Sequence, residues 1–132
     1  MTRSLATQFK ALSEDVRLQI LALIFRHQEL CVCEVERFLD ISQSKASRHL
    51  RYLLNAGILE DRRDGLWVYY RMAGSDSDQQ RLLLDFLCEL LHNVDVPDVS
   101  DQLRVMRAER CAPDASPARL AVVTSAPRAG TR

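Results

Sequence analysis

A β-hairpin signal in the middle of the chain restricts the fold more than any other feature of the sequence. The segments ILEDRR and LWVYYRM flank Asp64-Gly65, a residue pair that favours a two-residue hairpin turn. Upstream of the hairpin, Ser42 is a good cap for a helix over about residues 43–56, and Gly57 supplies a conformation that ends it. The sequence therefore predicts a capped helix followed directly by a two-stranded wing.

Three further helical segments precede this unit. The apolar stripe of residues 5–12 predicts a short first helix, and Ser13 is placed to cap a second helix that runs to about Arg26. A third helix is expected from near Leu30 to Leu39, with two of the four cysteines in its first turn. A short helix, a three-residue turn, a second helix and a hairpin follow the order of a winged helix-turn-helix. The predicted fold class is mostly α with a β-hairpin wing.

The last strongly apolar segment predicts a partner subunit. Residues 78–93 read as one helix with more leucine and phenylalanine than a single contact face can hide, which indicates a dimer. We assign residues 1–96 to a DNA-binding and dimerisation domain and residues 97–132 to a C-terminal extension. The extension is expected to be flexible from about residue 112, since it is rich in Ala and Pro there and lacks aromatic residues.

A candidate DNA-binding surface comes from local charge, because the whole chain is neutral, with eighteen Lys and Arg against eighteen Asp and Glu. Between Gln43 and Arg71 there are six basic residues against three acidic ones. A solvated charged face is the alternative interpretation, but the helix-turn-helix order and the hairpin favour DNA. Gln and Arg suit base edges, and Ser and Lys suit phosphates. The predicted DNA-contacting residues are Gln43, Ser44, Lys45, Ser47, Arg48, His49 and Arg51 on the helix, and Arg62 and Arg63 beside the hairpin turn.

The cellular compartment decides whether the cysteines are expected to be reduced or joined in disulfides. No apolar run approaches the ~20 residues of a membrane helix, and the first residues lack the apolar block of a secretory signal. We therefore expect a cytoplasmic protein that does not contact a membrane. Cysteines are kept reduced in that compartment, so a close pair indicates metal, metalloid or redox chemistry before a structural disulfide.

Cys31 and Cys33 form the only close cysteine pair. At positions i and i+2 their side chains would point to roughly opposite sides of a regular helix. They are either ligands or two small buried residues, since free cysteine is commonly buried. A zinc site is disfavoured, because zinc usually takes four ligands and no histidine lies at a matching spacing nearby. Cys88 and His92 have a metal-binding spacing, but the surrounding leucines favour a core position for Cys88.

Four segments together resemble a known family. ALSEDVRLQILALI, ELCVCEV, SQSKASRHLRYLLNAGIL and RRDGLWVYYRM occur in that order, and over roughly residues 3–92 the chain resembles the ArsR/SmtB family of winged-helix metal-responsive repressors, specifically its arsenic-responsive members. The resemblance implies a homodimer, without enzymatic activity or a constitutive cofactor, that binds double-stranded operator DNA. It implies release from the operator when arsenite or antimonite binds Cys31 and Cys33. It also implies a dimer interface formed by the first and last helices.

The chain departs from this pattern at one position. Many arsenic sensors of this type carry a third cysteine three residues after the second, where this chain has Glu36, and a carboxylate is a poor match for a soft ion. We expect a small thiol or hydroxide from solution as the third ligand, with Cys111 as a candidate protein donor and Cys88 as a less favoured one. If the two thiolates lie on opposite sides of the helix, one ion can engage both only by unwinding its first turn.

Three other functions remain open from the residues alone. The same fold could carry a thiol-based redox sensor or a sensor of another metal. A metalloid-carrying protein with a vestigial helix-turn-helix is a further alternative, which would lack operator binding. A thiol oxidoreductase is disfavoured, because the chain has neither a Cys-x-x-Cys motif nor a βαβ pattern.

Overall fold

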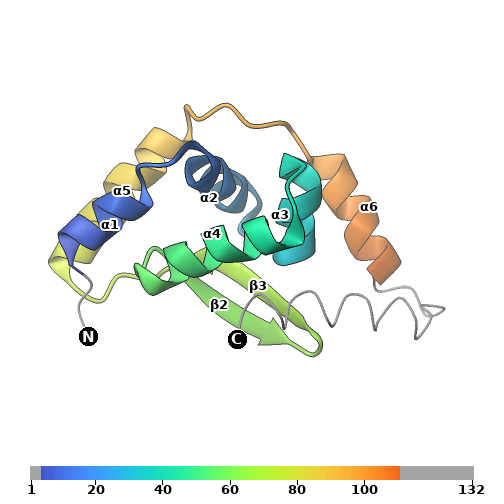
Figure 1. The fold of residues 1–132 in the computed structure, drawn as a ribbon, viewed down its shortest axis with the longest axis horizontal. Coiled ribbons are helices and arrows are strands. Elements are labelled where there is room, and N and C mark those ends of the chain that lie inside the picture. Colours follow the sequence, from blue (N-terminus) through green and yellow to red (C-terminus); the bar gives the residue numbers. More distant parts are fainter. Residues whose placement is uncertain (1–3, 111–132) are drawn as a thin grey trace.

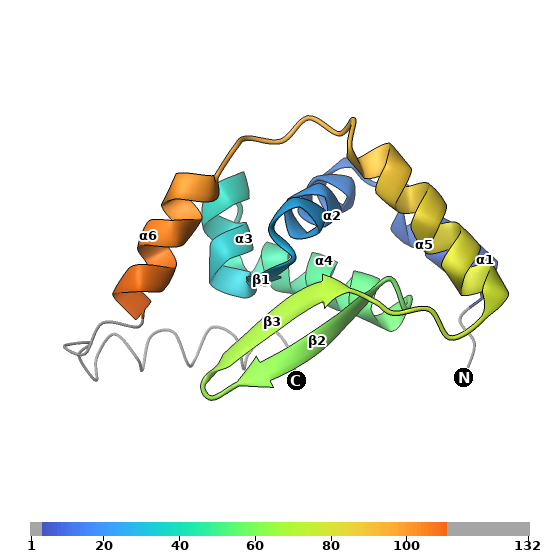
Figure 2. The same cartoon turned by 180° about the vertical axis from the view of Figure 1, so that it is seen from behind.

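The computed structural model describes residues 4–110 and shows a group of helices packed with a three-stranded antiparallel sheet (Figure 1, Figure 2). The elements are α1 (Leu5–Ala11), α2 (Asp15–His27), β1 (Glu29–Cys31), α3 (Val32–Leu39), α4 (Gln43–Asn55), β2 (Leu59–Asp64), β3 (Trp67–Met72), α5 (Asp78–Leu91) and α6 (Ser100–Arg110). This order confirms the predicted winged helix-turn-helix. Within residues 4–110, no helix has the length and apolar character needed to cross a membrane.

The hairpin forms as predicted, but its turn lies one residue further along the chain. Asp64 pairs with Trp67, so Gly65 and Leu66 make the two-residue turn. Gly65 has a φ of 63°, which glycine adopts without steric cost. A strand that the sequence did not indicate, β1, pairs with β3 and gives the strand order β1-β3-β2. The central strand therefore joins the wing to the segment that follows α2.

Two predicted helix starts are wrong. The side chain of Glu14 caps α2, whereas the Ser13 hydroxyl donates a hydrogen bond to a carbonyl of α1. The third helix begins at Val32 and not near Leu30, because Leu30 and Cys31 pair with β3 as part of β1. The predicted start of α4 is confirmed, since Ser42 accepts a hydrogen bond from a backbone N–H of its first turn.

The core lies between the central helices and the sheet. Ile20–Ile24 of α2 have no solvent exposure, and neither do Leu50 and Leu53 of α4. Val68 and Tyr70 of β3 are also buried. Helix α3 packs against α4, so the two helices of the helix-turn-helix share one core. Gly57, with a φ of 80°, ends the helical conformation after α4, as predicted.

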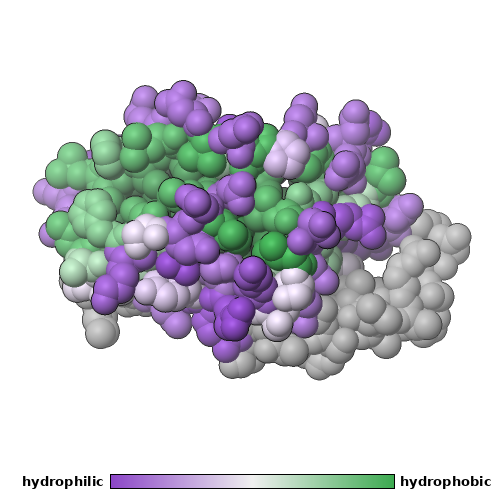
Figure 3. All heavy atoms as spheres, turned by 45° about the horizontal axis from the view of Figure 1, so that its top comes forward, coloured by the Kyte–Doolittle hydropathy of each residue, from purple (hydrophilic) through white to green (hydrophobic). Residues whose placement is uncertain are grey.

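An exposed apolar face lies on α1 and α5, which run side by side at one end of the molecule (Figure 1, Figure 2). Phe9 of α1 is 50% exposed, and Leu82, Phe86 and Leu90 of α5 are 65%, 57% and 48% exposed. Figure 3 shows apolar surface gathered on the side where these helices lie. The predicted excess of apolar surface on the segment 78–93 is thus confirmed.

Helix α6 lies within the extension assigned to residues 97–132, where no helix is predicted from the sequence. It runs beside α3 at the opposite end of the molecule from α1 and α5 (Figure 1, Figure 2). Val99 and Leu103 are buried in the common core, and Met106 packs against it. The predicted boundary after residue 96 stays a prediction. The flexibility predicted from residue 112 lies outside the described residues.

Candidate functional site

Cys31 and Cys33 lie where β1 meets α3, and their Sγ atoms are 3.1 Å apart. Cys31 ends β1 and is the cap residue of α3, with extended backbone angles (φ −97°, ψ 170°). Cys33 lies in the first turn of the helix. Because Cys31 is outside the helix, the 100° step between successive helical side chains does not separate the two thiols. The predicted placement on opposite sides of a helix is therefore wrong.

The two thiols differ in exposure and in pKa. Cys31 is fully buried, whereas Cys33 is partly exposed. The hydrogen bond with Cys33, together with burial, raises the pKa of the Cys31 thiol far above its ordinary value. The hydrogen bond from Cys31 lowers the pKa of the Cys33 thiol, assisted by the nearby Arg110 guanidinium and opposed by burial. Cys33 is therefore the sulfur that ionises first.

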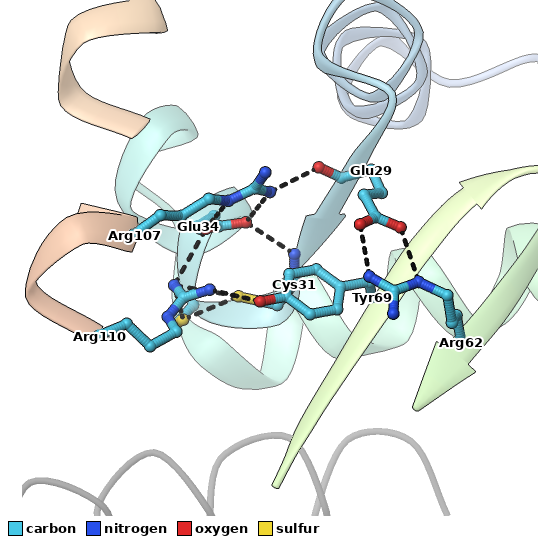
Figure 4. Close-up of polar contacts among 8 residues, drawn as sticks. Glu29, Cys31, Glu34, Arg62, Tyr69, Arg107 and Arg110 are labelled. Atoms are coloured by element: carbon cyan, nitrogen blue, oxygen red, sulfur yellow. Dashed lines mark hydrogen bonds and ion pairs between the residues drawn. The ribbon is translucent and has the colours of Figure 1, made fainter. Parts of the chain in front are cut away.

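A fully buried carboxylate, that of Glu34, lies next to the cysteine pair (Figure 4). It accepts hydrogen bonds from the Cys31 backbone N–H, from two nitrogens of Arg107 and from one nitrogen of Arg110, each at 3.0 Å. Burial would raise the pKa of Glu34, but these hydrogen bonds and the two guanidinium charges hold it below its ordinary value. The ionised carboxylate thus ties the start of α3 to α6.

The two arginines of α6 reach the cysteine site from the far end of the described chain. Besides its two hydrogen bonds to Glu34, Arg107 donates one to the Glu29 carbonyl of β1, at 2.8 Å. Arg110 donates to the Tyr69 hydroxyl at 2.9 Å, and its Cζ lies 3.8 Å from the centroid of the Trp67 ring. Its side chain is 8% exposed. These contacts fix α6 to both β1 and β3.

The wing arginines occupy different environments. Arg62 donates two hydrogen bonds to the carboxylate of Glu29, at 3.1 and 2.6 Å (Figure 4), and these lower the pKa of Glu29. Arg63, the next residue, is exposed. The guanidinium of Arg62 therefore joins β2 to the strand that leads into the cysteine pair, whereas Arg63 faces solvent.

The predicted DNA-contacting residues of α4 are only partly on its exposed face. Ser44, Lys45 and Arg48 are exposed, and Gln43, His49 and Arg51 are partly buried. Ser47 is 7% exposed, so it does not lie on the exposed face of the helix. The Nδ1 atom of His49 lies 3.3 Å from a guanidinium nitrogen of Arg17, and burial lowers the pKa of His49. Contact of any of these residues with DNA stays a prediction.

Comparison with known proteins identifies the family. Residues 14–61 match the family model described as bacterial regulatory protein, arsR family. Over 64 residues the chain is 56% identical to the arsenic resistance transcriptional regulator ArsR1 of Pseudomonas putida, an alignment that covers 48% of this chain and 50% of ArsR1. Over 88 residues it is 33% identical to the arsenical resistance operon repressor of Bacillus subtilis, which covers 67% of this chain and 82% of that repressor. The chain belongs to the arsR family.

Membership of the arsR family makes this chain a regulatory protein and not an enzyme. It also resembles the solved homodimeric winged helix-turn-helix DNA-binding domain of Mb0332 from Mycobacterium bovis, at 26% identity and a TM-score of 0.52, with 84% of each chain covered. The alignment with ArsR1 spans about half the length of that relative.

The other candidate ligands do not all lie beside the Cys31–Cys33 pair. Among residues 4–110, no group of three or more His, Cys, Asp or Glu side chains is arranged to hold a metal ion, so neither Glu36 nor Cys88 joins the cysteine pair in one. Cys88 is partly buried on α5, where burial raises its pKa. The ring of His92 instead packs edge-on against Phe25, with centroids 4.9 Å apart. Cys111 lies outside the described residues.

The sequence does not indicate the buried ion cluster around the cysteines. Glu34 follows Cys33 directly and resembles an ordinary first-turn acid. Arg107 and Arg110 fall in the C-terminal extension, for which no helix is predicted. One signal could have found α6: Val99, Leu103 and Met106 occur at i, i+4 and i+7, the spacing of an apolar helix face. No comparable local pattern links Arg110 to residues more than seventy positions earlier.

Proposed function

We propose that this arsR-family chain is a homodimeric repressor that binds operator DNA and releases it when trivalent arsenic or antimony bridges Cys31 and Cys33. The observation that carries the proposal is the 3.1 Å separation of the two sulfurs at the start of α3, a helix that packs against α4. The names of the relatives, which refer to arsenic and arsenical resistance, support the choice of ligand.

The donor set suits a soft trivalent ion. Thiolates prefer thiophilic ions, whereas imidazole and carboxylate ligands suit harder ones. Two sulfurs this close can bind one small ion without a large movement of the backbone. The expectation from the sequence that the first helical turn unwinds before both thiols reach the ion is therefore not needed in this proposal, because the two sulfurs already lie 3.1 Å apart.

Ligand binding would act on the packing at the start of α3. Cys31 caps this helix, and its backbone N–H donates to Glu34, so a bond from its sulfur to an ion alters the hydrogen-bonded first turn. α3 packs against α4, and β1 pairs with the wing strand β3. Because the two α4 helices of a dimer must match grooves about 34 Å apart, a small shift of α4 weakens operator binding.

The exposed apolar face on α1 and α5 supports dimerisation. Phe9, Leu82 and Phe86 are each at least half exposed, and burying such side chains gains about 25 cal/mol per Å² of apolar surface. The homodimeric state of the Mb0332 domain supports the same arrangement. We propose that this face is the dimer interface.

A thiol-based redox sensor is the second candidate function. The partly exposed Cys33, with its lowered pKa and a second sulfur 3.1 Å away, has the features of an oxidisable thiol. Oxidation would join the same two sulfurs that a metalloid would bridge. The two functions therefore differ in the inducer and share the residues.

Operator release separates these functions. An operator duplex is selected from random sequences, and binding is titrated with and without arsenite, and with and without hydrogen peroxide. We expect arsenite to release the unsubstituted protein. Cys31→Ser and Cys33→Ser should each bind the operator normally but fail to release it with arsenite, because a hydroxyl is a hard ligand.

Cys88→Ser is the matched control, since it removes a partly buried thiol outside the pair and should leave release unchanged. Release by peroxide but not by arsenite would instead establish the redox sensor. Normal arsenite release by both the Cys31 and the Cys33 variant would show that the inducer site lies elsewhere.

A further inference from the structure

One polar group faces both sulfurs of the cysteine pair. The Nη2 atom of Arg110 lies 3.7 Å from the Sγ atom of Cys31 and 3.9 Å from that of Cys33. An ion that bridges the two sulfurs would therefore lie beside this nitrogen. A trivalent ion held by two thiolates keeps one further coordination position, and the guanidinium is next to it.

Arg110 is held firmly in this place. Its Nη2 atom donates to Glu34, its Nη1 atom donates to Tyr69, and its guanidinium stacks on Trp67. Arg107 binds the same carboxylate one helical turn earlier, so α6 remains anchored independently of Arg110. A donor fixed by several contacts loses little entropy when it binds a ligand.

The other charged groups nearby are already engaged. Both oxygens of Glu34 accept hydrogen bonds from Arg107, and Glu29 is paired with Arg62. Within residues 4–110, no third thiol, imidazole or carboxylate completes a ligand group with the cysteines. A guanidinium cannot coordinate a cation, but it donates strong hydrogen bonds to an oxygen substituent. The site is therefore equipped for an ion that keeps an oxygen.

We propose that Arg110 is a specificity-determining residue, which donates a hydrogen bond to the hydroxyl that stays on arsenic after both cysteines have bound. The inference rests on the proposed function. It assigns inorganic arsenite as the preferred ligand over arsenicals whose third substituent is carbon, because a carbon substituent cannot accept this hydrogen bond. The hydroxyl thus fills the third position on arsenic, and the guanidinium holds it there by a hydrogen bond.

The chemistry is a simple exchange of ligands. Arsenite in water is As(OH)₃, and each cysteine forms a sulfur–arsenic bond as one arsenic–oxygen bond breaks. Each departing hydroxyl leaves as water with the proton of the thiol. Two waters are released, one hydroxyl remains on arsenic, and arsenic stays trivalent throughout. Phenylarsine oxide, hydrated to the corresponding dihydroxide, loses both hydroxyls in the same way and keeps its phenyl group.

The test measures binding of two ligands by the full reduced chain. Isothermal titration with arsenite and with phenylarsine oxide is carried out on the unsubstituted protein and on four variants: Arg110→Met, Arg104→Met, Cys111→Ser and Cys33→Ser. Arg104 is the matched control, because it lies on the same helix with its side chain 71% exposed and paired with Asp101. Circular dichroism checks that each variant retains its helices.

We expect Arg110→Met to weaken arsenite binding about tenfold or more, as for the loss of a hydrogen bond from a charged group. Binding of phenylarsine oxide should change less than about twofold on the same scale. Arg104→Met and Cys111→Ser should leave both affinities unchanged. The ratio of the two affinities separates a contact with the ligand from simple loosening of α6, which would affect both ligands alike.

Three results would overturn the inference. Equal losses for both ligands in Arg110→Met would reduce Arg110 to a structural role, and unchanged arsenite binding would remove it from the site. A selective loss of arsenite binding in Cys111→Ser would give the third position to a thiol. The proposed function fails separately, and this inference with it, if the unsubstituted chain binds neither ligand or if Cys33→Ser binds both normally.

Discussion

The cysteine site and the exposed face of α4 use charged residues in opposite ways. At the cysteines, Glu34 and Arg110 are buried and bound to each other, so their charges are satisfied inside the protein. On α4, Lys45 and Arg48 point their charges to solvent. Charges that are paired inside the protein help to hold one fixed geometry. Exposed positive charges remain free to contact a partner such as DNA phosphates.

The two regions are physically connected. α3 begins at the cysteine pair and packs against α4, and Arg62 of the wing binds Glu29, two residues before Cys31. A change at the sulfurs therefore reaches both parts of the proposed DNA-binding surface. If the two regions differ in this way, substitutions at the cysteine site and on the DNA-binding surface should have different consequences.

Replacing the buried carboxylate should cost the most stability. Glu34→Gln leaves Arg107 and Arg110 without their anion, and breaking a buried ion pair costs about 3 kcal/mol or more. Detachment of α6 limits the loss of stability, because the freed arginines can then reach solvent. Hydrogen exchange over residues 100–110 should therefore become faster as the free energy of unfolding falls. Glu36→Gln, two residues along and partly exposed, is the control and should change stability by less than about 0.5 kcal/mol. Equal effects of the two substitutions would contradict the special place of Glu34.

Acid should loosen α6, because protonation of Glu34 weakens its ion pairs with Arg107 and Arg110. The pKa of Glu34 is lower in the folded protein than its ordinary value of 4.5, so its contribution is complete above pH 4.5 and is lost as the pH falls through the folded value. Trp67, the single tryptophan of the chain, stacks on Arg110 and reports the change by fluorescence. The acid transition should be absent in Glu34→Gln. Persistence of an identical transition in that variant would assign it to another group.

Removing an exposed cation from α4 should affect DNA binding and not stability. If Arg48 reads a guanine, Arg48→Ala should weaken operator binding by about 1–3 kcal/mol, mainly at one base position, with the free energy of unfolding unchanged within about 0.5 kcal/mol. Competition with single-base operator variants measures this loss. Unchanged affinity would remove Arg48 from the contacts.

The neighbouring wing arginines should give the smallest effects, and unequal ones. Arg63→Ala should weaken binding to all sequences alike and reduce the salt dependence by about one phosphate contact. Arg62→Ala should change the salt dependence less, because its guanidinium is bound to Glu29. Both arginines are predicted from the sequence to contact DNA, but the structure gives them different environments. Equal reductions in salt dependence would show that Arg62 leaves Glu29 when DNA binds.

The parts of the fold that can be predicted from the sequence are those set by local signals. Ser42, Gly57 and the hairpin glycine act on their immediate neighbours, so α4 and the wing are predictable from short segments. The one-residue displacement of the turn shows the limit of such signals, because strand pairing sets the register.

The cysteine site depends on contacts that no short segment contains. Cys31 leaves the helix because β1 pairs with β3, about forty residues later in the chain. Glu34 meets Arg107 and Arg110 across more than seventy residues. The spacing of Cys31 and Cys33 marks them as candidate ligands, but their geometry and their buried partners follow from tertiary packing.

Arsenic X-ray absorption on the complex of the full reduced chain with arsenite tests the central claim most directly. Two sulfur neighbours and one oxygen neighbour are predicted at arsenic. The two-sulfur environment should be lost in Cys33→Ser and retained in Cys88→Ser. Three sulfur neighbours would contradict the role given to Arg110. The absence of sulfur neighbours would contradict the assignment of Cys31 and Cys33 as the inducer site.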